Sequence, residues 1–313
     1  MHDGLRIDDA IRCGVVLTGG DRDGTRRQAQ RIEALGFDSL WVGDHIAFHV
    51  PITDSLTLLA FAAGVTERVS LGTAVYLLPL RHPTLIAKTT ASLDLLSGGR
   101  LVFGVGVGGE FPPEFDAVGV PVSERGSRAD EAIAVVRRHW TEERVAHEGR
   151  HFRFGAVNVA PKPGRVPPIW VGGRAEAAMR RAGSKGDGYI SHMCAADKYR
   201  ENLALIAATA RTTGRGEIPF VPAAFLFTFL EDRYEVAHEK ASQLLGMVYA
   251  RDFREASKKY CLLGRPDDCL EQMRGFVRSG CRHFILAPLS DPAAFVDRVA
   301  AEMLPAIRTL SGQ

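Results

Sequence analysis

The sequence predicts an α/β fold in which eight strand–helix units close into a (β/α)8 barrel carrying two inserted segments. Short apolar runs of strand character alternate with amphipathic helix patterns along the chain. The units recur at spacings of about 30–40 residues, which indicates a parallel sheet with helical crossovers. The chain has 313 residues, enough for one such barrel, whereas an open doubly wound sheet of that size is uncommon.

The predicted strands are buried runs that end in glycine, proline or polar turns. They are expected at residues 11–17, 39–42, 69–78, 100–107, 169–171, 188–191, 220–229 and 283–287. The predicted helices have apolar residues at helical spacing, with Gly36 as a stop signal and Pro83 and Pro292 at first-turn positions. They are expected at residues 23–35, 55–66, 83–96, 123–140, 174–182, 198–211 and 266–279, and from residue 291 onward.

Two stretches interrupt this alternation. Residues 145–168 contain four prolines and the turn sequence Glu148-Gly149, which predicts a small antiparallel hairpin. Residues 231–261 are largely helical in pattern and longer than one unit requires. We therefore expect a single domain over residues 1–313, with insertions near 145–168 and 231–261.

The composition narrows the function classes. Hydrophobic residues make up 46% of the chain and charged residues 24%, as in soluble globular proteins. The net charge of +2 gives no sign of a nucleic acid or membrane-surface partner, and no apolar segment has the length of a signal peptide or membrane span. The five cysteines form no C-x-x-C pair. This pattern predicts a cytoplasmic protein without a zinc site or a disulfide framework.

The stretch with the strongest functional signal follows the strand at 39–42. Asp44 and His45 come directly after it, and the carboxyl ends of barrel strands are where active sites lie. Taken by themselves, these two residues also allow a purely structural interpretation, because an aspartate there often caps the next helix and a lone histidine is often structural.

A glycine-rich run, Gly104-Val105-Gly106-Val107-Gly108-Gly109, matches the pattern G-x-G-x-x-G. In a dinucleotide-binding fold the third glycine opens a helix, but here Glu110-Phe111-Pro112-Pro113 follows, a poor helix interior. We reject that fold. The glycines instead predict a strand end that a flat ligand or another backbone can approach closely, or simply a tight packing corner.

A third candidate is Gly172-Gly173-Arg174, at the end of the fifth predicted strand. Free backbone N–H groups, a helix N-terminus and an arginine together can hold a phosphate. A Gly-Gly pair can equally be a plain turn. Thr73, Ala74 and Val75, inside the third predicted strand, have on their own chemistry the character of ordinary core residues.

Taken together, these stretches resemble the luciferase-like monooxygenase family, and within it the branch that depends on coenzyme F420, a deazaflavin. The resemblance covers nearly the whole chain. The matching motifs are Leu40-Trp41-Val42-Gly43-Asp44-His45, Leu71-Gly72-Thr73-Ala74-Val75, Gly99-Arg100-Leu101, Gly104-Val105-Gly106, Glu124-Arg125-Gly126, Pro168-Ile169-Trp170-Val171-Gly172-Gly173, Gly186-Asp187-Gly188, Gly264-Arg265-Pro266-Asp267-Asp268 and Leu304-Pro305.

The resemblance implies a TIM barrel with a cofactor lying across the carboxyl ends of its strands. Asp44 and His45 match the family's Asp-His, which faces the deazaflavin ring and the substrate. The other residues expected to bind the cofactor are Thr73, Ala74 and Val75 around a non-proline cis peptide behind the ring, Gly106, Val107 and Gly108 beside it, and Gly172, Gly173 and Arg174 at its phosphate.

The resemblance also has departures. The sugar-phosphate dehydrogenases of this branch carry a tryptophan four residues after the histidine, where this chain has His49. Their glutamate after strand four aligns with Gly109, or with Glu110 if a gap is allowed. Glu110 is therefore a candidate proton donor, and glucose-6-phosphate is not the substrate that these positions favour.

We expect an oxidoreductase that moves a hydride between the deazaflavin and a small organic substrate. His45 would donate or accept the proton, because imidazole titrates near neutral pH, and Asp44 would orient His45 or bind the polar edge of the ring. The alternatives are an FMN-dependent monooxygenase and a non-catalytic protein that binds a flavin or deazaflavin. A homodimer is expected from the resemblance, whereas metal, nucleic acid and membrane partners are not.

Overall fold

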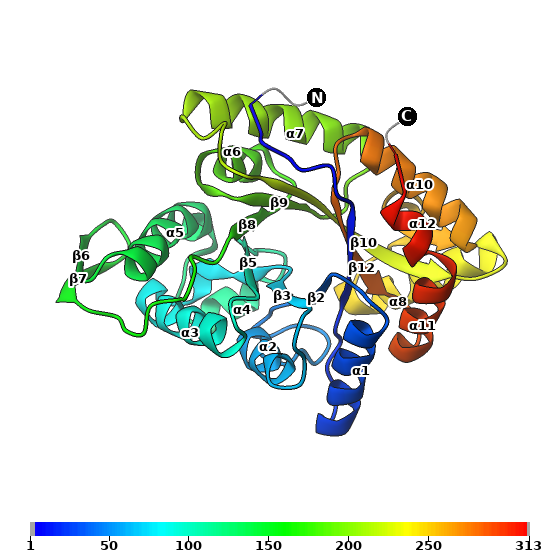
Figure 1. Cartoon of the computed structure of the whole chain (residues 1–313), viewed down its shortest axis with the longest axis horizontal. Coiled ribbons are helices and arrows are strands. Elements are labelled where there is room, and N and C mark those ends of the chain that lie inside the picture. Colours follow the sequence, from blue (N-terminus) through cyan, green and yellow to red (C-terminus); the bar gives the residue numbers. More distant parts are fainter. Residues whose placement is uncertain (1–3, 312–313) are drawn as a thin grey trace.

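The computed structural model describes residues 4–311. Eight parallel strands form a closed ring around the centre of the molecule (Figure 1). In ring order they are β1 (Arg12–Val16), β2 (Ser39–Val42), β3 (Ser70–Thr73), β5 (Leu101–Gly106), β8 (Ile169–Gly172), β9 (Gly188–Ser191), β10 (Val221–Leu230) and β12 (His283–Pro288). The β9–β10 and β12–β1 pairs are both parallel and close the ring, which confirms the predicted barrel and excludes an open sheet.

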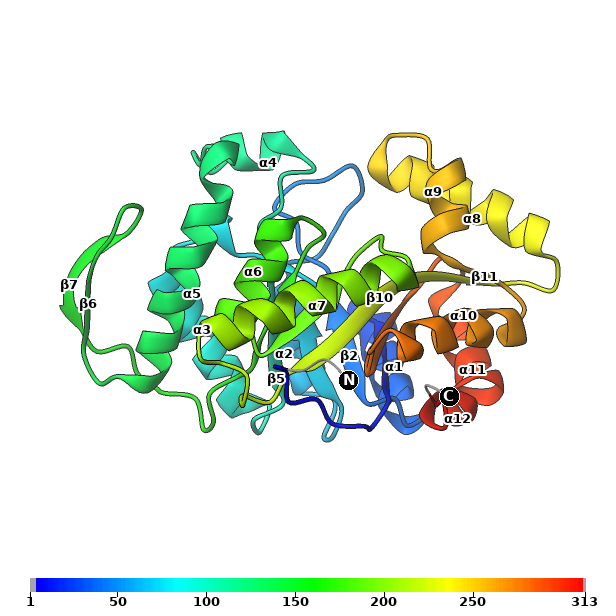
Figure 2. The ribbon, with the colours of Figure 1, turned by 90° about the horizontal axis from the view of Figure 1, so that it is seen from above.

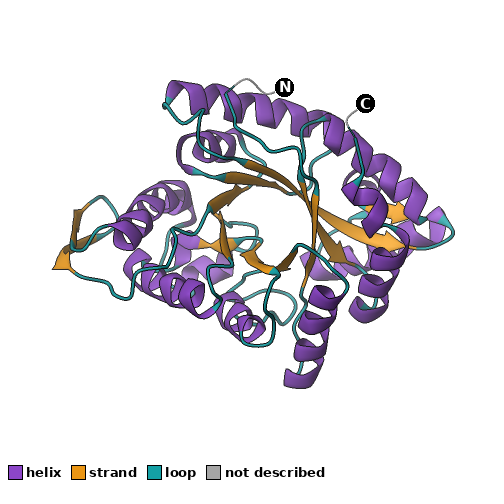
Figure 3. Cartoon of the chain, viewed as in Figure 1, coloured by secondary structure: helices purple, strands orange, loops and turns teal. Residues whose placement is uncertain are grey.

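Helices cover the outside of the ring (Figure 3). They are α1 (Arg22–Ala34), α2 (Ser55–Ala63), α3 (Pro83–Leu96), α5 (Arg125–Thr141), α6 (Glu176–Lys185), α7 (Ala196–Thr212), α10 (Pro266–Arg278), α11 (Pro292–Glu302) and α12 (Leu304–Arg308). The main core lies between these helices and the strands. Within residues 4–311, none of the helices combines the length and apolar character that crossing a membrane requires.

The barrel interior is filled by side chains that the strands point inward. Trp41 and Trp170 lie with ring centroids 5.1 Å apart, and His283 meets both edge-on. The indole N–H of Trp41 donates to Ser39 Oγ at 2.7 Å, and Ser39 Oγ lies 2.7 Å from His283 Nε2. The serine hydroxyl thus links the indole of Trp41 to the imidazole of His283 inside the barrel. This packing closes the interior of the barrel with side chains.

Two segments extend beyond the barrel. The strands β6 (Val145–Glu148) and β7 (Arg153–Val157) form an antiparallel hairpin beside α5. The second segment contains α8 (Tyr234–Tyr249), α9 (Arg254–Tyr260) and β11 (Leu262–Gly264), a short strand that pairs with β10 and that the sequence pattern did not indicate. Figure 2 shows α8 and α9 at the same end of the barrel as α4 (Pro112–Asp116).

Two predictions near the site are corrected. The third predicted strand, at 69–78, is broken: β3 ends at Thr73 and β4 (Tyr76–Leu77) follows. The non-proline cis peptide that the resemblance implied joins Ala74 to Val75 at the break, and that expectation is confirmed. The stretch after Glu110, interpreted as a poor helix interior, contains the helix α4, because its two prolines occupy the first turn, where the backbone N–H groups have no helical partner. Both corrections concern segments at the carboxyl end of the barrel.

Candidate active site

A cavity of about 760 Å³ opens at the carboxyl end of the first two strands. Residues 18–20, which follow β1, and residues 45–53, which follow β2, line it. His45 lies in its wall, as the position of Asp44-His45 after a barrel strand predicted. The long loop after β2 therefore supplies both the candidate proton carrier and most of the surface around it.

The imidazole of His45 is held by a carboxylate that the sequence did not point to. Its Nδ1 lies 3.2 Å from each carboxylate oxygen of Glu114, on α4. Glu114 Oε2 also accepts a hydrogen bond of 3.2 Å from the N–H of Ile46. The Phe48 ring stacks on the imidazole at a centroid distance of 4.0 Å. The ring is therefore fixed at one edge and on one face.

Asp44, by contrast, is engaged away from His45. Arg81 Nη1 and Nη2 donate to its two oxygens at 2.5 and 2.9 Å, and the Ser55 hydroxyl and the Leu77 N–H donate at 3.0 and 2.9 Å. The residue is 3% exposed. Glu114, rather than Asp44, is thus the carboxylate that contacts His45. Asp44 instead ties the end of β2 to the segment that follows the cis peptide.

That segment forms one wall of the barrel mouth. A Cβ built on Gly106 would lie 2.3 Å from Val75 Cγ2, and one built on Gly172 would lie 2.5 Å from Val75 Cγ1. Both distances are impossible for real atoms, so glycine is required at both positions for Val75 to occupy its place between β5 and β8. The side chain of Val75 therefore packs against the backbone at Gly106 and Gly172, which carry no side chains. A planar ring can fit against such a surface.

The predicted phosphate site lies where β8 ends and α6 begins. Gly173 adopts a φ of +145°, and the helix α6 begins just after it without a side-chain cap at Ala175. The first N–H groups of α6 thus lack a side-chain acceptor and suit an anion. Arg174 itself pairs with Glu110 at 2.9 Å.

Glu110 and Arg174 lie near His192, which follows β9. Burial lowers the pKa of His192 to about 4, and the charges of Glu110, Arg174 and Arg251 act on it as well. Loops after β5, β8 and β9 therefore meet at this side of the mouth. The roles expected for Glu110 and Arg174 stay predictions.

Sequence reasoning missed Arg81 and Glu114. A signal for Glu114 existed, since Pro112-Pro113-Glu114 is a typical first helical turn with an acidic residue. Nothing in the local sequence connects this turn to His45, which is 69 residues away. Arg81 had no local signal at all.

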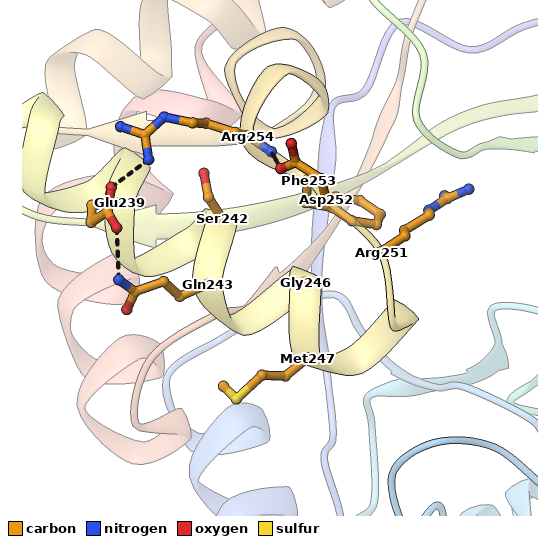
Figure 4. A pocket seen from close by; sticks show the side chains of 9 residues that line it. All are labelled: Glu239, Ser242, Gln243, Gly246, Met247, Arg251, Asp252, Phe253 and Arg254. Carbon is orange, nitrogen blue, oxygen red and sulfur yellow. Dashed lines mark hydrogen bonds and ion pairs between the residues drawn. The ribbon is translucent and has the colours of Figure 1, made fainter.

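A second cavity, of about 560 Å³, lies against α8 and the loop before α9 (Figure 4). Its polar side chains already bond to one another, since Gln243 and Arg254 both donate to Glu239. It contains none of the residues that the sequence singled out. The cavity beside His45 is therefore the candidate active site.

Comparisons with known proteins point in the same direction. The family model of luciferase-like monooxygenases matches residues 10–283. An F420-dependent glucose-6-phosphate dehydrogenase of Intrasporangium calvum is 30% identical over 317 residues, which cover 90% of this chain and 93% of that protein.

Two solved structures share the fold. An F420-dependent secondary alcohol dehydrogenase, in complex with an F420-acetone adduct, superposes with a TM-score of 0.84 at 22% identity, over 96% of this chain and 99% of that one. The monooxygenase RslO1 from Streptomyces bottropensis gives a TM-score of 0.80 at 26% identity, over 95% and 99% of the two chains. The overall fold of this chain is thus shared with both of these proteins.

Proposed function

The chain belongs to the luciferase-like monooxygenase family, and we propose on this premise which reaction it catalyses and which residues take part. It is a coenzyme F420-dependent oxidoreductase that transfers a hydride between the deazaflavin and a small organic substrate. The observation that carries the assignment of the site is the position of His45, in the wall of the mouth cavity with one nitrogen held by a buried carboxylate.

When bound, the deazaflavin supplies the ring carbon that gives or takes the hydride. The protein positions the ring and the phosphate of the cofactor. Val75, with Gly106 and Gly172 behind it, forms the wall for the ring. Gly173 and the first N–H groups of α6 hold the phosphate.

His45 exchanges the proton with the substrate, because its imidazole lies at the cavity and has one nitrogen that Glu114 does not hold. Asp44 holds the segment that follows Val75 in place, because it accepts hydrogen bonds from Arg81 and from the Leu77 N–H. Glu110 is a second candidate proton donor, paired with Arg174.

The cavity favours an uncharged substrate. The residues that line it include no lysine, arginine, aspartate or glutamate. Two arginines of the barrel mouth are already neutralised, Arg81 by Asp44 and Arg174 by Glu110. A phosphate group binds where cationic donors can face it, so a sugar phosphate finds no such partner in this lining. A small alcohol, ketone, imine or enone fits it better.

Fluorescence titration of the purified chain with oxidised F420, reduced F420 and FMN tests the cofactor. We expect both forms of F420 to bind more tightly than FMN. Tight binding of FMN without binding of F420 would overturn the assignment and favour the oxygen-using branch of the family.

Turnover with F420 and a panel of alcohols, imines, enones and glucose-6-phosphate tests the substrate. We expect an uncharged member of the panel to react. Turnover of glucose-6-phosphate alone would contradict the argument from the lining, and F420 binding without turnover of any compound would favour a carrier.

Two further expectations concern where the protein is located and whether two copies pair. The five cysteines are buried and unbridged, which supports a reducing, cytoplasmic location that cell fractionation can check. Pairing of two copies, expected from the resemblance, is tested by sedimentation of the purified chain.

A further inference from the structure

We propose that Glu114 is a positioning residue for the proposed reaction: its buried carboxylate holds His45 in one tautomer and one orientation. The inference rests on the proposed function, because it concerns the residue that there exchanges the proton. It differs from the expectation that Asp44 orients His45, and it adds a residue from α4 to the site.

The geometry restricts the imidazole. A carboxylate can only accept hydrogen bonds, and both oxygens of Glu114 lie 3.2 Å from His45 Nδ1. In the neutral ring the hydrogen therefore sits on Nδ1, and Nε2 is the nitrogen left without it. The histidine side chain is 21% exposed and the glutamate side chain 0% exposed, so the pair is open to the cavity only through the imidazole.

Glu114 is itself held in place. Its Oε2 accepts from the N–H of Ile46, and its neighbour Phe115 is fully buried in a cluster with Leu77, Leu80 and Val120. A short helix anchored in this way keeps the carboxylate in one position. The remaining freedom of the imidazole, rotation of its plane, is limited by the stacked Phe48 ring.

The other carboxylates of the mouth cannot take this role. Asp44 uses both oxygens for Arg81, Ser55 and the Leu77 N–H, and Glu110 pairs with Arg174. In a comparable arrangement, a buried carboxylate that accepts from one histidine nitrogen leaves the other nitrogen ready for the reacting group. Loss of such a carboxylate allows the wrong tautomer.

The test is nitrogen NMR of the full chain labelled with ¹⁵N-histidine, with the His45 signal identified through His45→Asn. At about pH 8.5, where an ordinary imidazole is neutral, we expect the wild-type ring to carry its hydrogen on Nδ1. In Glu114→Gln the other tautomer becomes a major species, since a single amide oxygen must serve both Nδ1 and the Ile46 N–H. A wild-type ring with its hydrogen on Nε2 would overturn the proposal without any variant.

A matched control exists in the hairpin insertion. His147 Nε2 lies 2.9 Å from Glu131 Oε1, and Glu131 also accepts backbone N–H bonds, so Glu131→Gln removes the same kind of pair elsewhere. It should leave the His45 signal unchanged. If Glu114→Gln also leaves that signal unchanged, Glu114 only anchors the loop and the proposal fails.

Kinetics give a second readout. With the fastest alcohol of the panel, Glu114→Gln should lower kcat about 10- to 100-fold with KM changed less than about threefold, because alignment of the proton carrier is lost while binding is kept. F420 affinity should stay within about twofold of wild type, since Glu114 faces His45 and not the ring wall. Failure of the wild-type chain to bind F420 would refute the proposed function alone, because the tautomer is measured without cofactor.

Discussion

Among the histidine–glutamate pairs of residues 4–311, those of His45 with Glu114 and of His147 with Glu131 have nearly the same chemistry in very different surroundings. At the mouth, Glu114 joins His45 to the N–H of Ile46. Beside α5, Glu131 joins His147 to the N–H groups of His151 and Phe152, and so fastens the hairpin of β6 and β7.

The surroundings decide what each pair can do. His45 lies in the wall of a cavity at the carboxyl end of the barrel, whereas His147 packs against Phe154 of its own hairpin. Although burial by itself would raise the pKa of Glu131, the hydrogen bonds from His147 and the two backbone N–H groups lower it below its ordinary value. The hairpin pair thus fastens β6 and β7, whereas the mouth pair has its histidine in the wall of a cavity.

The largest expected difference between the two regions is catalytic. His45→Ala should lower the rate of hydride transfer by roughly 10²- to 10⁴-fold, the usual contribution of a proton-transferring side chain. Its affinity for F420 should change little. Single-turnover measurements with the fastest alcohol give the rate, and fluorescence titration gives the affinity.

His147→Ala is the control for that experiment and should leave both quantities near wild type. If His45→Ala turned over at the wild-type rate, the imidazole would have no part in the reaction.

A second difference concerns ion pairs. Arg81→Met should reduce the free energy of unfolding by about 3–5 kcal/mol, because it leaves the buried Asp44 carboxylate without its cation. Arg153→Met, in the hairpin, breaks a pair whose side chains are 74% and 77% exposed and should cost no more than about 1 kcal/mol. Denaturant unfolding measures both. If both variants lost the same free energy of unfolding, the buried Asp44 carboxylate would depend on Arg81 no more than the exposed Glu148 depends on Arg153.

A third difference concerns glycine. Gly106→Ala places a methyl group 2.3 Å from Val75 Cγ2, which should cost about 1–3 kcal/mol of stability and weaken F420 binding as the wall shifts. Gly155→Ala, in the hairpin, meets no atom within 4 Å and should have little effect on either. Thermal unfolding and fluorescence titration compare the two. An alanine tolerated at Gly106 with full F420 affinity would remove this wall from the proposed binding site.

The smallest expected difference is in pH dependence. Burial in the barrel lowers the pKa of His283 to about 3, so the folded state resists protonation more than the unfolded state does. Its contribution to stability is complete above the unfolded pKa of about 6.5 and falls with pH below it, by about 2 kcal/mol between pH 6.5 and 5. The lowered pKa of Glu131 acts in a lower window, because its contribution is lost only as the pH falls below about 4.5.

Denaturant unfolding from pH 8 to 4 separates the two windows. In His283→Asn the loss between pH 6.5 and 5 should shrink, while in Glu131→Gln it should persist. The same slope in wild type and His283→Asn would assign the effect to other groups.

The sequence by itself determined the barrel. Strong local signals placed Ser39–Val42, Pro83–Leu96 and Gly188–Ser191 at the bounds that the structure has, since burial period, glycine stops and a first-turn proline act over a few residues. It also placed His45 at the mouth, because the carboxyl ends of all strands in a parallel barrel lie at the same end and His45 follows one of them.

Only the tertiary structure decided which groups meet there. Asp44 adjoins His45 in sequence, but successive residues at a strand end point in different directions, and Asp44 faces Arg81. Glu114 reaches His45 because the loops after β2 and β5 converge across the mouth. The break of the third strand and the packing of Val75 against Gly106 and Gly172 depend in the same way on three neighbouring strands. A contact between two distant segments does not show in the residue pattern of either segment. The partner of His45 could therefore be found only in the folded chain.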